Sequence, residues 1–182
     1  MRKNVQTVDK NSREYLQNQF SGGRSSLLAV LIFTVVNLVM VLLDTGTQFL
    51  FSASVPYYLT FLGKAIDNNF SYGDWDVNGT FTITGLVIGV VVLVVYLLCW
   101  LLSKKRGGWL TAALVLFILD TVALLIFTVT LLEDPSANIM DFVFHGVIIW
   151  QLIMAVRANG KLKRLPPENF NPMGYYGAGP EF

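Results

Sequence analysis

Four long apolar runs constrain this chain more than any other feature of its sequence. They cover residues 27–43, 81–102, 109–132 and 139–156, and each is at least as long as the ~17 residues that a helix needs to cross a bilayer. The whole chain is 54% hydrophobic and 14% charged, whereas a typical soluble domain is about 25% charged. The sequence therefore predicts an all-α integral membrane protein whose four spans pack as a four-helix bundle.

The connection between the first two spans contains a shorter apolar stretch, residues 49–62, which Pro56 interrupts. This stretch is too short to cross a bilayer. Its aromatic residues suit the headgroup level of a membrane, where such rings are favoured; they include Phe49, Phe51, Tyr57 and Tyr58. We therefore expect residues 49–62 to re-enter the membrane or to lie at its surface.

The distribution of cations predicts the orientation of the spans. Five Lys or Arg residues lie in residues 1–26, three in the 103–108 loop and four from residue 157 onward, which leaves only Lys64 elsewhere. Cytoplasmic segments carry such an excess of positive charge, so both termini are expected in the cytoplasm. A fifth crossing through residues 49–62 would place Lys104–Arg106 outside, and the charge count therefore favours four spans.

The two ends of the chain differ from the membrane domain, residues 27–156. Residues 1–26 are predicted to be a cytoplasmic segment, in which 12–20 forms either a surface helix ended by Gly22 and Gly23 or a solvated terminus. Residues 157–182 are rich in Pro, Gly, Asn and Tyr towards their end. This composition predicts a flexible cytoplasmic tail, which is either a docking peptide or a disordered end.

Several polar side chains interrupt the apolar runs or cap their ends, and at such depth they need partners. These candidates are Asn37, Asp44, Asp120, Asp141, His145 and Gln151. At ~1.5 Å per residue, Asp120 and Gln151 fall at one depth, and Asn37 and His145 at another nearer the outside. The sequence predicts two polar layers formed by these pairs, with Asp141 one turn above His145 and Asp44 at the outer end of the first span.

Three interpretations of these polar residues remain open. They hydrogen-bond neighbouring helices together, with Asp120 neutral; or Asp120 and His145 carry protons or cations; or Asp141 and His145, four residues apart, contribute to a metal site. Two ligands are too few for a metal, so the third interpretation is the weakest. No catalytic or nucleotide-binding motif occurs, and the basic residues follow the spans, so no cofactor or nucleic-acid partner is predicted.

Gly85 and Gly89 form a small-residue pair in the second span, where another helix can approach closely. The partner helix belongs either to the same chain or to a second copy. Cys99 is the only cysteine, which excludes a disulfide within the chain and suggests a packing role.

The stretches GRSSLLAVLIFTVVN, FLFSASVPYYL and DFVFHGVIIWQLIMAVRANGKLK resemble small multispanning membrane proteins of Gram-positive bacteria. That family has no established activity, so the resemblance implies only the class and a plasma-membrane location. The sequence thus predicts a non-enzymatic membrane-embedded component of an assembly, with the lipid bilayer and a second copy or another membrane protein as partners. The alternative is a small proton- or cation-coupled transporter or channel subunit that uses Asp120 and His145.

Overall fold

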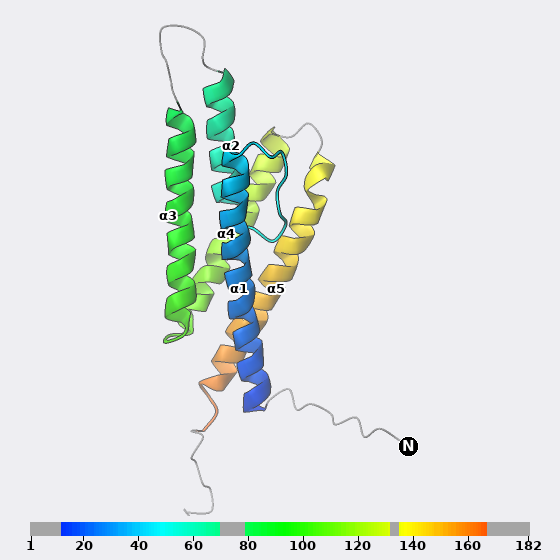
Figure 1. The fold of residues 1–182 in the computed structure, drawn as a ribbon. Coiled ribbons are helices and arrows are strands. Elements are labelled where there is room, and N and C mark those ends of the chain that lie inside the picture. Colours follow the sequence, from blue (N-terminus) through cyan, green and yellow to red (C-terminus); the bar gives the residue numbers. More distant parts are fainter. Residues whose placement is uncertain (1–11, 70–78, 132–134, 167–182) are drawn as a thin grey trace, which may run out of the picture.

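The computed structural model describes residues 12–69, 79–131 and 135–166, and in these ranges every regular element is a helix (Figure 1). The helices are α1 (Arg13–Leu42), α2 (Ser54–Asn69), α3 (Thr80–Ser103), α4 (Gly108–Leu131), a 3-10 turn η1 (Pro135–Asn138) and α5 (Ile139–Leu162). Four of them, α1, α3, α4 and α5, are long and apolar enough to cross a membrane. The prediction of an all-α chain with four helices of spanning length is therefore confirmed.

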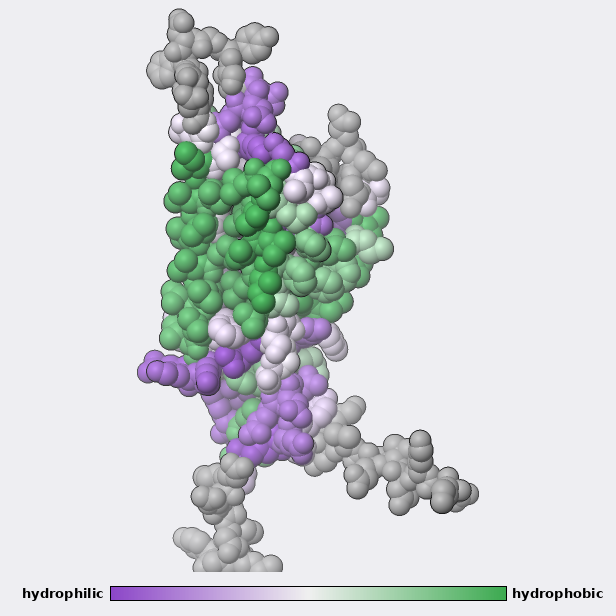
Figure 2. All heavy atoms as spheres, in the orientation of Figure 1, coloured by the Kyte–Doolittle hydropathy of each residue, from purple (hydrophilic) through white to green (hydrophobic). Residues whose placement is uncertain are grey.

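The surface of the molecule carries a wide apolar belt. Figure 2 shows this belt across the middle of the face in view, with hydrophilic residues gathered at the two ends of the molecule. Large aliphatic side chains on the belt are open to the surroundings, for example Leu119 at 59% and Val129 at 68% of full exposure. Soluble proteins rarely expose an apolar patch of this extent, and the belt is therefore the surface that faces lipid.

The helix α1 is continuous from the hydrophilic end into the belt. Ser12 caps it, because the backbone N–H of Tyr15 donates to the Ser12 hydroxyl oxygen at 3.3 Å. The predicted break at Gly22 and Gly23 does not occur. Instead, α5 packs so closely on α1 that a Cβ atom added to Gly23 would lie 2.3 Å from Cβ of Ala155. This glycine permits close helix packing, so the segment from 13 to 26 belongs to α1 and forms no separate surface helix.

The far end of the chain also departs from the predicted boundary. The fourth span was expected to end at residue 156, but α5 continues to Leu162, so residues 157–162 are helical and do not belong to a flexible tail. Residues 167–182 and 1–11 lie outside the described residues. The prolonged ends of α1 and α5 run together past the connection between α3 and α4 (Figure 1).

The connection after α1 turns back into the molecule. Three residues of this loop have positive φ angles, namely Asp44 at 55°, Gly46 at 65° and Phe51 at 68°. Figure 1 shows the loop descending from the end of α1 to the middle of α4, and α2 rising from that level. Pro56 lies in the first turn of α2, where backbone N–H groups have no intrahelical partner, and so it does not break the helix. The predicted segment 49–62 is therefore divided between a loop and a helix.

Glycines set the packing of α2 against α3. A Cβ atom added to Gly85 would lie 2.3 Å from the carbonyl oxygen of Leu59, and one added to Gly63 would lie 2.3 Å from that of Phe81. Gly89 faces the first turn of α2, with an added Cβ 3.2 Å from its backbone. The structure thus places Gly85 and Gly89 against a helix of the same chain.

Asp67, near the end of α2, holds the beginning of α3. Its carboxylate accepts the backbone N–H of Phe81 at 3.1 Å, and the backbone N–H and hydroxyl of Thr82 at 2.7 and 2.5 Å. Desolvation works against ionisation of Asp67, but these hydrogen bonds outweigh it, so the pKa of this carboxyl lies below its ordinary value. A carboxylate in this position also complements the positive end of the α3 dipole.

Candidate functional site

Asp120 occupies the middle of α4 and caps the start of α2. Its Oδ2 accepts the backbone N–H of Ser54 at 2.8 Å, and its Oδ1 accepts that of Val55 at 2.9 Å. The first N–H groups of a helix have no intrahelical acceptor, and they form the positive end of its dipole. Since Asp120 is only 4% exposed, its carboxyl group supplies the acceptors that water would otherwise provide.

His145, on α5, lies against the same carboxyl group. Its Nε2 is 3.3 Å from Asp120 Oδ2 and 3.3 Å from the hydroxyl oxygen of Ser54. Its ring stacks on Phe117, with the ring centroids 4.9 Å apart. Its Nδ1 lies 2.8 Å from the backbone carbonyl oxygen of Asp141. A carbonyl can only accept a hydrogen bond, so Nδ1 carries a proton and faces Asp141.

The geometry limits where a further proton can be held. A hydrogen bond between Asp120 and His145 needs one proton between them, either on the carboxyl group or on Nε2. In both cases the pair is neutral overall. If that proton leaves, Asp120 is an anion held by two backbone N–H groups, and the Ser54 hydroxyl can donate to Nε2 in its place. The same arrangement therefore accommodates the pair with or without the shared proton.

Two polar residues of α1 bind the backbone of the loop. Asn37 accepts the N–H of Phe49 at 2.7 Å, and its Nδ2 donates to the Phe49 carbonyl at 2.8 Å and to the hydroxyl of Ser52 at 2.7 Å. The hydroxyl of Thr34 accepts the N–H of Ala53 at 2.8 Å. Both α1 residues are fully buried. Irregular backbone at membrane depth is tolerated only when it is buried and hydrogen-bonded in this way.

The predicted polar layers are replaced by different pairs. Asp120 lies against His145, Asn37 binds the loop, and Gln151 accepts a hydrogen bond from Ser26 on the exposed side of the α1–α5 contact. The depth estimate failed because it counted residues from the ends of the spans as if the helices were parallel. Figure 1 shows α4 and α5 inclined to each other, so equal counts do not give equal levels.

The acidic candidates Asp141 and Asp44 stay apart from the imidazole ring of His145. The carboxylate of Asp141 accepts a hydrogen bond from Gln48 Nε2 at 2.7 Å, and Asp141 meets His145 through its backbone carbonyl. Asp44 is 79% exposed in its side chain and pairs with Lys64 at 2.8 Å. Within the described residues no three His, Cys, Asp or Glu side chains gather as a metal site would require.

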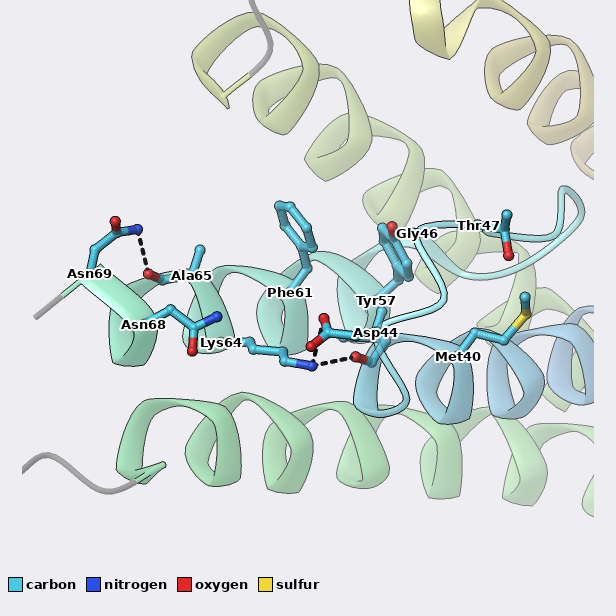
Figure 3. Close-up of a pocket in the computed structure, with 11 residues that line it drawn as sticks. Met40, Asp44, Gly46, Thr47, Tyr57, Phe61, Lys64, Ala65, Asn68 and Asn69 are labelled. Carbon is cyan, nitrogen blue, oxygen red and sulfur yellow. Dashed lines mark hydrogen bonds and ion pairs between the residues drawn. The ribbon is translucent and has the colours of Figure 1, made fainter. Parts of the chain in front are cut away.

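Lys64 lines a cavity of about 350 Å³ between the end of α1, the loop and α2 (Figure 3). Its ammonium group donates to the carbonyl oxygen of Val41 at 3.0 Å and reaches Asp44 beside it. A cation is favourable near the last carbonyl groups of a helix, where the dipole is negative. This lysine therefore fixes the end of α1 to α2.

The sequence analysis did not identify Thr34 and Ser54 as site residues. It also missed a polar contact among η1, α2 and α4. There, Asn138 donates to the hydroxyl of Tyr58 at 2.7 Å and to that of Thr128 at 2.8 Å. Hydroxyl residues in apolar helices commonly bond their own backbone, so they gave no signal on their own. The spacing of Thr34 and Asn37, one turn apart in an apolar run, is the signal that was available.

These features define a class. The chain is a multi-pass helical membrane protein in which polar side chains of the long helices bind a buried loop and the start of a short helix. Comparison with protein-family models, with curated proteins and with solved structures finds no match.

Proposed function

We propose that this chain is a plasma-membrane protein without enzymatic activity that acts as a membrane-embedded component of an assembly. The observation that carries the proposal is the double hydrogen bond from Ser54 and Val55 to Asp120. These hydrogen bonds give a structural role to Asp120, the intramembrane side chain whose burial costs the most free energy. Consistent with that role, no buried side-chain nitrogen or oxygen among the described residues lacks a hydrogen-bond partner. A second copy or another membrane protein is the proposed partner.

In this proposal α2 is a half-helix that enters the membrane from the outside and returns to the same side. The position of its first turn beside Asp120, in the middle of α4, supports this placement. The bonds from Thr34 and Asn37 to the loop support it as well, because they satisfy backbone groups that lipid could not. Both termini are then cytoplasmic, and the end of α2 is outside.

Cysteine labelling tests this orientation. In a Cys99→Ala background, Asn69→Cys is expected to react only with a reagent added outside, and Lys105→Cys only after the reagent enters the cell. Both positions are exposed. Asn69 ends α2 and Lys105 follows α3, and these two helix ends lie at opposite ends of the molecule (Figure 1), while residues 70–78 lie outside the described residues. Reaction of Asn69→Cys from the cytoplasmic side alone would contradict the proposed orientation.

A proton or cation carrier is the second candidate function. One observation favours it: the backbone hydrogen bonds to Asp120 and to His145 Nδ1 are compatible with the Asp120–His145 pair both with and without its shared proton. From His145 the contacts lead to Asp141 and then to Gln48 in the loop. These groups lie towards the proposed outer side, which is the side from which the pair would exchange its proton in this function.

Flux measurements in liposomes distinguish the two functions. If Asp120 is structural, the wild-type protein is expected to carry no proton or monovalent-cation flux above that of empty liposomes. If the pair is a carrier, the wild-type flux is abolished by Asp120→Asn and reduced by His145→Gln. Thr121→Val is the matched control, because the Thr121 hydroxyl bonds only the Phe117 carbonyl of its own helix in the described structure. A wild-type flux that survives both substitutions would exclude Asp120 and His145 as its carriers.

A further inference from the structure

A lateral pocket of about 240 Å³ opens where α2 begins between α3 and α4. Its rim includes Val91, Val95 and Leu119, which are 57%, 39% and 59% exposed. Tyr96 and Asp120, both buried, form its inner end. The rim residues belong to the apolar belt, so the pocket opens towards lipid rather than towards water.

Asp120 gives this apolar pocket a negative end. A carboxylate has about four acceptor positions, and three of them are used by Ser54, Val55 and His145. Oδ1 accepts one hydrogen bond and Oδ2 accepts two, so the remaining position is on Oδ1. Val55, which binds Oδ1, also lines the pocket, whereas Ser54 and His145 do not. Oδ1 is therefore the oxygen on the pocket side.

We propose that the pocket binds a small lipophilic ammonium ion that reaches it from the bilayer. The aliphatic walls suit an alkyl or aromatic body, and the carboxylate suits one positive charge. Attraction between these charges is strong because lipid and protein exclude water around them. Tyr96 adds an aromatic residue to the lining of the pocket. The pocket is smaller than the ~300–1,000 Å³ of common ligand sites, so the ligand is small or leaves its chain in the lipid.

Binding of the cation is coupled to release of a proton. An ammonium ion beside Oδ1 stabilises ionised Asp120, and the proton shared between Asp120 and Nε2 is released from the site. The Ser54 hydroxyl donates to Nε2 afterwards, and Nδ1 keeps its proton and its bond to Asp141. One cation enters and one proton leaves, so the charge of the site is unchanged.

The groups around the pair do not oppose this exchange. Among the described residues, α4 adds no other titratable group, and α1 faces the site with Thr34 and Asn37 only. On the remaining helices, Lys64 and Asp67 lie ten or more residues after Ser54 in α2, and Arg157 and Lys161 lie twelve or more residues after His145 in α5. The titratable groups of these helices nearer to the pair are Tyr57 and Tyr58 on α2, Tyr96 and Cys99 on α3, and Asp141 on α5. None of them carries a positive charge. The shared proton is therefore the positive charge that the entering cation displaces.

Calorimetry on the full chain in nanodiscs of zwitterionic lipid tests the proposal. The probe is hexyltrimethylammonium, with empty nanodiscs, the uncharged hydrocarbon of the same shape and hexylsulfonate as comparisons. Saturable binding is expected for the cation alone, and its affinity should rise about tenfold per pH unit wherever the pair still holds the shared proton. The dependence of the heat on the buffer should show release of about one proton per bound cation.

Matched substitutions on α4 locate the binding. Leu119→Trp fills the rim without touching the polar groups and is expected to weaken binding at least about tenfold. Val122→Trp, on the same apolar face but outside the pocket, should leave binding unchanged. Asp120→Asn should abolish it, and the Leu119 variant keeps the test decisive if Asp120→Asn does not fold. The proposal is overturned if no saturable binding occurs, if the uncharged analogue binds equally, or if both tryptophan variants behave alike.

Discussion

Replacement of Asp120 by leucine is expected to lower the free energy of unfolding by about 2–6 kcal/mol. Leucine leaves the backbone N–H groups of Ser54 and Val55 buried without an acceptor, and each such group costs about 1–3 kcal/mol. Asparagine retains one acceptor oxygen, so Asp120→Asn is expected to lose less stability than Asp120→Leu. The two substitutions thus separate hydrogen bonding from packing at one position.

Two measurements check this expectation. Unfolding in detergent micelles gives the change in stability, and hydrogen exchange of the Ser54 and Val55 amides reports the start of α2 directly. Thr121→Val, at the next residue, should change neither. If the two amides of Asp120→Leu exchange as slowly as those of the wild type, Asp120 does not cap α2 and the proposed structural role is wrong.

The contrast between the predicted and observed partners of Asp120 has a physical cause. The need for a partner could be predicted from the sequence, because an ionisable group inside an apolar run is costly. Its identity could not, since two of the three partners are backbone N–H groups, which every residue other than proline has. The same holds for Asn37, which binds the backbone of Phe49. Side-chain patterns therefore indicated where polar groups are buried and not what they bind.

The helices of spanning length could be predicted from the sequence because their formation does not depend on partners elsewhere in the chain. Each one forms its backbone hydrogen bonds internally except at its ends, so its apolar composition and length suffice to identify it. The helix α2 is short and partly polar, and its beginning depends on Asp120 of a distant segment. Its break at Pro56 was inferred from the conformational limits of proline alone. The helix actually starts at Ser54, two residues before Pro56. Its start is capped by Asp120, which lies 65 residues after Val55 in the sequence.

Substitution of Gly85 by alanine is expected to separate α2 from α3. The added Cβ would lie 2.3 Å from the carbonyl oxygen of Leu59, and backbone cannot move aside as a flexible side chain can. Overpacking of this kind costs about 1–3 kcal/mol. Gly63→Ala, which meets the carbonyl oxygen of Phe81 at the same distance, should have a similar effect from the other side of the contact.

Gly146→Ala is the matched control, because an added Cβ at this exposed position of α5 meets nothing within 4 Å. Alanine has the higher helix propensity, so this variant should be as stable as the wild type or gain up to about 1 kcal/mol. Unfolding and the oligomeric state are measured together in the same detergent. A contact between α2 and α3 predicts that Gly85→Ala destabilises the monomer itself. If Gly85 served instead as a contact between two copies, the substitution would dissociate an oligomer and leave the unfolding of the monomer unchanged.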